Sequence, residues 1–408
     1  MWLVPAKREQ NDTRISSAER EEQVTKAQSQ RNVPRLRFLE FKGEWEKITL
    51  GEIGDTFNGL TGKSGSDFGH GSPYITYKSI FDNAKIDLSR VEYVEITDAE
   101  RKKKTQTEVQ YGDVFFTTSS ETPNEVGMSS VLLDNVKDCY LNSFCFGYRL
   151  KSLKFTLPEY MRFYLRSQTI RKKMYVLAQG STRFNISKGE VMKVSVMIPT
   201  VEEQHKIAVL FSLIDERIAT QNKIIEKLET LIKGIVETVI SSQKPNTLIK
   251  NCLECNSSTL QESQVAETGT FPVYGATDIS GYTETAGING ESILIIKDGS
   301  GVGTVKFVSG EYSYIGTLNS LTAKDGYCLK YIYFALQRFS FEPYKTGMAI
   351  PHIYFKDYGK AKIYCPSFSL QTLIAQKLSL IENKMEVEKR IILCYQLQRS
   401  YLLSRMFI

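Results

Sequence analysis

Two glycine-rich segments have residue types that could bind a phosphate group, because main-chain amides in such loops can surround phosphate oxygens. Gly59-Leu-Thr-Gly-Lys-Ser64 ends like a Walker loop, but that motif requires a glycine five residues before Gly62, where Phe57 stands. Gly299-Ser-Gly-Val-Gly303 lies between two strand-like runs and does not open a helix, as a dinucleotide-binding loop would. The sequence therefore predicts neither nucleotide hydrolysis nor dinucleotide binding, and a β-turn is expected at 299–303.

Cysteine and histidine side chains could bind a metal ion, and Cys252 and Cys255 form the only CxxC pair. No second pair accompanies them, and none of the three histidines (His70, His205 and His352) is near them in the sequence. Structural zinc is therefore not expected. The seven cysteines are scattered and odd in number, which favours free thiols in a reducing compartment over a disulfide framework.

Motifs of several enzyme classes are missing from the sequence. It contains no His-Glu-x-x-His zinc site, no nucleophile elbow, and no Asn-Pro-Pro-aromatic tetrad of amino-methyltransferases. Catalytic chemistry is therefore expected elsewhere. The basic runs Arg101–Lys104 and Arg171–Lys173 fit either a solvated face or contacts with phosphates.

The composition describes a chain of 408 residues with 41% hydrophobic residues, 24% charged residues and a net charge of +6. One core rarely extends beyond roughly 250–300 residues, so two domains are expected. The mild positive charge fits nucleic-acid binding but is shared by many enzymes. No apolar run approaches the roughly 20 residues of a membrane span, and the start is charged too soon for a signal peptide, which predicts a cytoplasmic protein.

Strand-like runs rich in β-branched and aromatic residues dominate two stretches of the chain. In the first stretch they include Tyr74–Tyr77, Val114–Thr117 and Val191–Ile198, with one amphipathic helix near Pro158–Tyr175. In the second stretch, from about Leu248, they include Phe271–Tyr274, Ser292–Ile296 and Thr304–Val308, with a helix near Leu329–Phe341. Residues 1–31 are polar and lack apolar periodicity, so a tail or a loosely held helix is expected there.

After each stretch, apolar residues recur every three or four positions, as in a coiled-coil helix. The first row is Ile207, Leu210, Ile214, Ile218, Gln221, Ile225, Leu228, Ile232, Ile235 and Val239. The second row is Ile374, Leu378, Ile381, Met385, Glu388, Ile392, Tyr395, Arg399, Leu402 and Met406. Thr200 followed by Glu203 predicts a capping box at the first helix, and the segment 201–240 would span roughly 60 Å.

A constant offset of 167 residues superposes the ends of the two halves without a gap: Gly180 meets Gly347, Pro199 meets Pro366, and Gln204 meets Gln371. Any two amphipathic helices align at some offset, but chance alignment does not explain the matched glycine, proline and N-cap positions. Gln221 falls on Glu388, and a polar seam residue usually fixes the register of a coiled coil. The strands match more weakly, with Gly112–Thr117 opposite Gly290–Ile295. The sequence therefore predicts a tandem duplication.

This order of parts resembles the specificity subunit of type I restriction-modification enzymes, in which a target-recognition domain and a conserved helix each occur twice. The resemblance is strongest at Val33–Phe38, Gly43–Trp45, Leu50-Gly51, Asn185–Ser187, Ile198-Pro199, Glu203–Ile207, Tyr274–Ala276, Gly281-Tyr282 and Lys297–Ser300. Two features depart from it. Leu370 stands where the first helix has Glu203, and the residues before Asn32 match nothing expected.

The resemblance implies an α+β fold with a pseudo-twofold internal repeat, in which the two long helices form an antiparallel coiled coil. The implied parts are a polar N-terminal extension at 1–31, target-recognition domain 1 at 32–199, the central conserved helix at 200–243, target-recognition domain 2 at 244–366, and the C-terminal conserved helix at 367–408. Each domain would read one half of a bipartite, asymmetric DNA target. The helix pair would set the gap between the halves.

The resemblance also implies the partners. These are double-stranded DNA, two methylation subunits that bind S-adenosylmethionine and modify adenine, and restriction subunits that use ATP and Mg to translocate and cut DNA. The methylation subunits would pack on the helices. The chain itself would bind no cofactor or metal and would have no catalytic residue.

Loop position and polarity identify candidate DNA-binding residues, because readout uses exposed polar side chains on loops. In the first domain the candidates are Lys63, Ser64, Tyr77, Lys78, Ser119, Ser120, Thr122, Arg183 and Asn185. In the second they are Thr277, Asp278, Lys297, Ser300, Asn319, His352 and Tyr354. Each also fits a solvated or turn-forming role.

Two other functions stay open at this point. The long helices fit an assembly rod whose β domains bind protein or carbohydrate, and the basic charge is the only feature of the composition that opposes this. A stand-alone nuclease or methyltransferase is disfavoured by the missing motifs.

Overall fold

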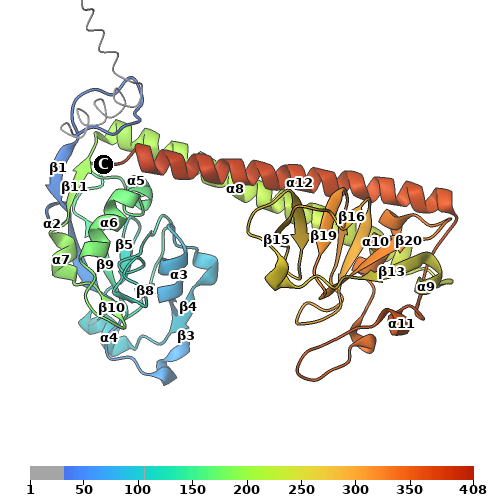
Figure 1. The fold of residues 1–408 in the computed structure, drawn as a ribbon. Coiled ribbons are helices and arrows are strands. Elements are labelled where there is room, and N and C mark those ends of the chain that lie inside the picture. Colours follow the sequence, from blue (N-terminus) through green and yellow to red (C-terminus); the bar gives the residue numbers. More distant parts are fainter. Residues whose placement is uncertain (1–31, 105) are drawn as a thin grey trace, which may run out of the picture. The chain divides into compact units, whose positions relative to one another are not determined.

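The computed structural model describes residues 32–104 and 106–408. These residues form two compact units (Figure 1). The first unit contains the described residues up to Ile218 together with Leu393–Ile408, and the second contains Ala219–Ile392. The extension expected at 1–31 lies outside the described residues.

Short strands and short helices alternate through the first unit. Its strands are β1 (Glu46–Thr49), β2 (Gly54–Asn58), β3 (Phe68–Ile75), β4 (Glu92–Val94), β5 (Val114–Thr117), β6 (Ser119–Ser120), β7 (Ser129–Val131), β8 (Tyr140–Leu141), β9 (Cys145–Leu150), β10 (Phe184–Asn185) and β11 (Ser195–Ile198). Its short helices are α2 (Leu50–Ile53), η1 (Gly65–Asp67), α3 (Tyr77–Asp82), η2 (Leu88–Arg90), α4 (Asp98–Lys103), α5 (Pro158–Tyr164), α6 (Gln168–Val176) and α7 (Lys188–Met192).

Strand β5 lies at the centre of the first unit, in a sheet of order β2-β9-β5-β7. Successive residues of a strand point to opposite faces. Phe116 stacks on Phe146 of β9 at a centroid distance of 5.1 Å, whereas Phe115 belongs to a second cluster with Ile75 and Ile80. Because β5 is covered on both faces, its sequence is a continuous apolar run and does not alternate with polar residues.

The second unit repeats this arrangement. Its strands are β12 (Thr247–Leu248), β13 (Leu253–Ser257), β14 (Phe271–Tyr274), β15 (Ile279–Thr283), β16 (Ile288–Asn289), β17 (Ser292–Ile296), β18 (Val305–Val308), β19 (Glu311–Tyr314), β20 (Leu318–Ala323) and β21 (Lys362–Ile363). Its short helices are α9 (Ile249–Cys252), η4 (Glu262–Gln264), α10 (Leu329–Gln337), η5 (Glu342–Tyr344) and α11 (Phe355–Tyr358).

Strand order confirms the duplication predicted from the sequence. The sheet β13-β20-β17-β18 of the second unit corresponds to β2-β9-β5-β7, and the pair β12-β21 corresponds to β1-β11. A parallel pair also recurs, β3 with β8 in the first unit and β14 with β19 in the second. β17 is one residue longer than β5.

Two long helices follow the sheets: α8 (Val201–Val236), which continues into the π-helical turn η3 (Glu237–Ser241), and α12 (Phe368–Arg405). In the first unit, Asp215 near the start of α8 accepts a hydrogen bond from Arg399 near the end of α12, at 2.6 Å. In the second unit, Val236 at the end of α8 shares a core cluster with Ile374 and Leu378 near the start of α12. The two helices therefore pair antiparallel.

The seam residues predicted from spacing are buried or half-buried along both helices, with one exception. Val239 is 37% exposed, whereas Ile240 is 3% exposed. A π-helical turn contains more residues than an α-helical turn, so η3 moves the apolar face by one residue. The assignment of Val239 to the seam was therefore wrong.

A buried glutamine ties the start of α8 to the first unit. Oε1 of Gln204 accepts a hydrogen bond from the amide of Leu157 at 2.8 Å, and Nε2 donates to the carbonyl oxygens of Phe155 and Pro199, both at 2.9 Å. Phe155 and Leu157 precede α5, so this one side chain joins the start of α8 to the segment before α5.

The second unit uses the same device at the position predicted by the offset. Oε1 of Gln371 accepts from the amide of Cys328, just before α10, at 3.0 Å, and Nε2 donates to the carbonyl oxygen of Pro366 at 2.8 Å. Both glutamines are fully buried. The matched glutamines are thus a structural feature of the repeat.

The predicted capping box at α8 forms only in part. The hydroxyl of Thr200 accepts a hydrogen bond from the amide of Glu203 at 3.4 Å. The carboxylate of Glu203 does not return to the N-cap, because both its oxygens bind the guanidinium of Arg37 at 2.7 Å. Glu203 therefore anchors an upstream segment to the helix.

Three local predictions were wrong because short helices occur inside the segments where other elements were expected. The single helix expected near Pro158–Tyr175 is split into α5 and α6, since the hydroxyl of Ser167 accepts from the amide of Ile170 and caps α6. The strand expected at Val191–Ile198 is reduced to β11, because Val191 belongs to α7. The strand expected at Tyr74–Tyr77 ends at Ile75, because Thr76 caps α3.

Residues near the end of the chain complete the core of the first unit. Phe407 is buried, and its ring stacks on Phe211 of α8 at a centroid distance of 5.7 Å and also contacts Tyr160 and Tyr164 of α5. The amide of Leu36 donates to the carbonyl oxygen of Arg405 at 3.0 Å. The first unit is therefore built from segments at both ends of the described chain.

Two glutamine substitutions should change stability in opposite directions. Gln204→Leu leaves a buried amide and two carbonyl oxygens without partners, so it should lower the free energy of unfolding by about 2–3 kcal/mol. Gln221→Leu removes a buried Oε1 that finds no hydrogen-bond partner among the described residues and adds an apolar seam residue, so it should raise that free energy by about 1 kcal/mol. Urea denaturation of the full chain measures both free energies of unfolding. Two changes of the same sign would contradict the roles assigned here to Gln204 and Gln221.

Candidate nucleic-acid interface

In the first unit, a strand end and a hairpin form a polar corner. β6 (Ser119–Ser120) follows β5 and pairs antiparallel with β10 (Phe184–Asn185). β10 is one arm of the hairpin 179–185, whose ends exchange main-chain hydrogen bonds between Gln179 and Asn185 at 2.8 and 2.9 Å. Ile186 then donates its amide to the carbonyl oxygen of Thr118 at 2.9 Å. We call residues 118–120 and 179–186, with Tyr77, the first corner.

The second unit has the same main-chain arrangement after β17. The ends of the hairpin 346–352 exchange hydrogen bonds between Thr346 and His352 at 2.7 and 2.9 Å. Ile353 donates its amide to the carbonyl oxygen of Lys297 at 2.9 Å, as Ile186 does to Thr118. We call residues 297–300 and 346–354 the second corner.

Different side chains occupy the two corners. In the first, the Tyr77 hydroxyl donates to the carbonyl oxygen of Ser119 at 2.6 Å. In the second, Nδ1 of His352 lies 2.7 Å from Oδ1 of Asp298. The same backbone therefore carries a tyrosine hydroxyl hydrogen-bonded to a main-chain oxygen in one unit and a histidine–aspartate pair in the other.

Several residues that the sequence nominated gather in these corners. In the first corner Tyr77, Ser119, Ser120, Arg183 and Asn185 lie together, and Thr122 is linked through Glu125, which accepts from the hydroxyls of both Thr122 and Ser120. The second corner contains Lys297, Ser300, His352 and Tyr354. Their side chains differ in access: Arg183, Asn185, Ser300 and Tyr354 are exposed, whereas Ser119 and Ser120 are mostly buried.

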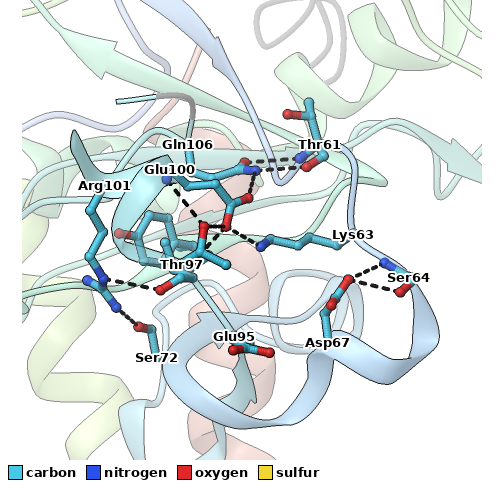
Figure 2. A network of polar contacts seen from close by, with 12 residues as sticks. Thr61, Lys63, Ser64, Asp67, Ser72, Glu95, Thr97, Glu100, Arg101 and Gln106 are labelled. Carbon is cyan, nitrogen blue, oxygen red and sulfur yellow. Dashed lines mark hydrogen bonds and ion pairs between the residues drawn. The ribbon is translucent and has the colours of Figure 1, made fainter. Parts of the chain in front are cut away.

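Lys63 and Ser64 lie outside the corners, in a network of their own (Figure 2). The ammonium of Lys63 is 2.7 Å from the carboxylate of Glu100, and its side chain is only 7% exposed. The amide of Ser64 donates to the carboxylate of Asp67 at 2.6 Å, which caps η1. Both residues are thus engaged within the fold. The phosphate loop that their sequence superficially resembles is not formed, because a 3-10 turn follows.

The other nominated residues are also outside the corners. Lys78 is exposed at the start of α3, and Thr277 and Asp278 are exposed between β14 and β15, where Asp278 pairs with Lys306. Asn319 is buried in β20 and accepts a hydrogen bond from the hydroxyl of Ser257 at 2.8 Å. The assignment of all these residues to DNA stays a prediction.

The basic runs are partly used inside the fold. The guanidinium of Arg171 donates to the carbonyl oxygens of Asn124, Val126 and Gly127 at 2.6–2.7 Å, and burial lowers its pKa to about 10. Arg101 pairs with Asp138. These two guanidinium groups therefore hold loops of the first unit, Arg171 through hydrogen bonds and Arg101 through an ion pair.

Sequence analysis named Arg183 at the tip of the first hairpin, residues 180–183, but it missed residues 347–350 at the equivalent tip of the second hairpin. Their signal was present, since Gly180 and Gly347 match in the repeat, but it was read only as a sign of duplication. The sequence predicted no structural zinc at Cys252 and Cys255. Sγ of Cys252 lies 3.7 Å from Sγ of Cys365 in the core of the second unit. Within 32–104 and 106–408, no three His, Cys, Asp or Glu side chains gather in a geometry that could hold a metal ion.

Comparison with known proteins gives matches in both halves of the chain. The profile described as type I restriction modification DNA specificity domain matches residues 42–230 and 251–393. A protein of Methanocaldococcus jannaschii, named as the type I restriction enzyme MjaX specificity subunit, is 26% identical over 213 residues, which are 52% of this chain and 48% of that protein. The match thus spans about half the length of this curated relative.

Two solved structures have a similar fold. The S subunit of a type I restriction-modification system from M. genitalium has a TM-score of 0.63 at 18% identity, over 92% of this chain and 99% of that chain. A chain solved in work on complex assembly and conformational transition of the type I R-M system has a TM-score of 0.53 at 15% identity, over 91% and 99%. In the described residues, no helix is long and apolar enough to cross a membrane.

The Lys63–Glu100 network should respond to acid. Its hydrogen bonds from Lys63 and from the amide of Thr97 lower the pKa of Glu100 to about 2, from its usual 4.5. A lowered carboxyl pKa stabilises the fold above pH 4.5, and this stabilisation is lost as the pH falls toward 2. Glu100→Gln should therefore lower the urea midpoint at pH 7 and by less near pH 3. The exposed Glu121→Gln is the control, and a Glu100→Gln effect that does not change with pH would contradict this role.

Proposed function

The chain belongs to the family of type I restriction modification DNA specificity domains, and from this premise we propose that it recognises a bipartite, asymmetric DNA target, with one half read by each unit. The observation that carries the proposal is the repeated corner: one backbone arrangement, present twice, with different side chains each time. Direct readout needs hydrogen-bonding and apolar side chains held at defined positions against base edges. Two identical scaffolds with unlike side chains suit two unlike half-sites.

The long helices suit the role of a spacer between the half-sites. Together α8 and η3 comprise residues 201–241, which at the helical rise of 1.5 Å per residue would span roughly 60 Å. One turn of B-DNA is about 34–36 Å long, so readers separated by such a helix would contact separate major-groove segments. In this proposal the helix pair sets the gap in the target.

An exposed apolar row on α12 supports a docking role for the helices. Leu373, Leu380 and Val387 recur every seven residues on a face that does not contribute to the buried seam, and all three are about half exposed or more. Leu213 of α8 is the residue that the offset of 167 aligns with Leu380 in the sequence, and it is exposed as well. Apolar residues seven positions apart lie on one face of an α-helix, and this heptad pattern is the one by which helices pack against each other. We assign this row to helices of two methylation subunits.

In this proposal, catalysis and its cofactors belong to the partners. S-adenosylmethionine would be bound by the methylation subunits, and ATP and Mg by restriction subunits. The chain would contribute target selection and assembly, and it would act where its DNA and partner subunits are, in the cytoplasm.

DNA protection tests the two-reader proposal. The chain in complex with its methylation subunits should protect two separated segments of its target, and affinity should fall steeply with salt because phosphate contacts release counterions. Arg183→Ala should weaken binding by about tenfold or more, through contacts in one half-site only, if Arg183 reads a base. Arg90→Ala, an exposed arginine outside the corners, is the matched control. One uninterrupted protected segment, or affinity independent of salt, would refute the proposal.

Assembly tests the docking row. Leu380→Asp places a charge on an exposed position, so the melting temperature of the chain should change little, whereas binding of methylation subunits should weaken by tenfold or more. Asn383→Asp adds the same charge to an exposed position of α12 outside the row. Titration calorimetry measures both variants. Equal affinity of Leu380→Asp and Asn383→Asp would remove the row from the interface.

A further inference from the structure

The hairpins at 179–185 and 346–352 have one backbone and opposite tip chemistry. Each hairpin begins with a glycine of positive φ, Gly180 at +131° and Gly347 at +87°. A Cβ at Gly180 would lie 2.2 Å from the carbonyl oxygen of Arg183, and one at Gly347 would lie 2.4 Å from that of Ile350. Both turns therefore require glycine for the same reason, a close approach to the carbonyl oxygen three residues later.

The residues after each glycine are not needed to form the turn. In the first hairpin they are Ser181, Thr182 and Arg183, and in the second they are Met348, Ala349 and Ile350. The same turn forms with a polar, cationic tip and with an apolar one, so the fold does not select these side chains. The tip side chains of the two units can therefore contact different groups outside the chain.

The apolar tip is unusually exposed. Met348 is 104% exposed and Ile350 is 57% exposed, and neither belongs to a hydrophobic cluster of the described residues. Single exposed apolar residues are common on proteins. Here, however, two lie within three residues of each other, on a turn anchored beside the polar pair Asp298 and His352.

We propose that the 347–350 tip reads thymine in the second half-site, with Met348 and Ile350 packing on the C5-methyl group in the major groove. This inference rests on the proposed function. The thymine methyl is the one apolar group that base pairs present in that groove, and apolar side chains are its partners. The equivalent tip in the first unit carries Arg183, whose guanidinium suits guanine or phosphate.

The contrast between the tips favours DNA over a protein partner. A partner subunit that docked on both units in the same way would select the same tip chemistry twice. Two different half-sites select different chemistries on the same turn. The different tips of the two equivalent hairpins therefore favour DNA as the ligand, because the two half-sites differ in sequence.

A tip exchange tests the assignment in the complete complex with its methylation subunits. The triple variant Met348→Ser, Ala349→Thr, Ile350→Arg installs the side chains that the same backbone already carries in the first unit, and it keeps Gly347. Methylome sequencing of cells that express each complex should show a changed or lost second half-site and an unchanged first half-site. An assembled triple variant that methylates the wild-type sequence at the wild-type rate would overturn the proposal.

Base analogues test the methyl contact directly. Each thymine of the second half-site is replaced in turn by deoxyuridine, which lacks only the methyl group. For the wild-type complex, at least one replacement should weaken binding by about fourfold, the value of one buried methyl-sized group. The Ile350→Thr complex, which retains a β-branched residue, should lose less at that position. The proposal is overturned if no replacement weakens wild-type binding, or if the half-site contains no thymine on either strand.

The outcomes separate this inference from the proposed function. If the wild-type complex shows no site-specific protection of DNA, the proposed function itself fails. If protection is bipartite but insensitive to the tip exchange and to deoxyuridine, only the role of the tip fails. The matched change Ser181→Ala in the first hairpin should leave the deoxyuridine pattern of the second half-site unaltered.

Discussion

One buried glutamine near the start of each long helix joins that helix to its own unit. Gln204, in the first turn of α8, makes three hydrogen bonds to the segment before α5 and to the proline before α8. Gln371 of α12 makes two, to the residue before α10 and to the proline before α12. A side-chain amide both donates and accepts hydrogen bonds without carrying charge, so it can satisfy backbone groups in a core where an ion would be costly. Each long helix is thereby fixed to its own unit at its first turn.

Periodicity explains which parts of the fold could be predicted. The seam rows and the two long helices were predicted from apolar periodicity, and the repeat was predicted from a constant offset of 167 residues. Both kinds of spacing can be read directly from the sequence. The split between α5 and α6 depends instead on the hydroxyl of Ser167, which accepts a hydrogen bond from a backbone amide and starts α6. The π-helical turn η3 adds a residue to the helix, and the apolar pattern gives no sign of it. Such features depend on local hydrogen bonds, which short-range patterns do not reveal.

The candidate interface shows the same division. Arg183, Asn185 and His352 were found from polarity and loop position, and they lie in the corners. Lys63 has the same polarity, but a carboxylate 37 positions later in the chain engages its charge, and Asn319 sits inside a sheet. Whether a polar residue faces outward is decided by contacts far along the chain. The apolar tip at 347–350 was missed for the opposite reason, because apolar residues are not usually counted as readers of DNA.

The burial of Phe407 among residues of α5 and α8 has a consequence for biosynthesis. Its ring belongs to the core of the unit that the ribosome makes first, yet it emerges about two hundred residues after that unit's own sheet. Domains usually fold in order as they leave the ribosome. The core of the first unit therefore lacks one of its buried rings until residue 407 has been synthesised. A nascent chain interrupted within α12 would therefore expose an unfinished core to quality control, so truncated subunits would be removed before they could compete for partners.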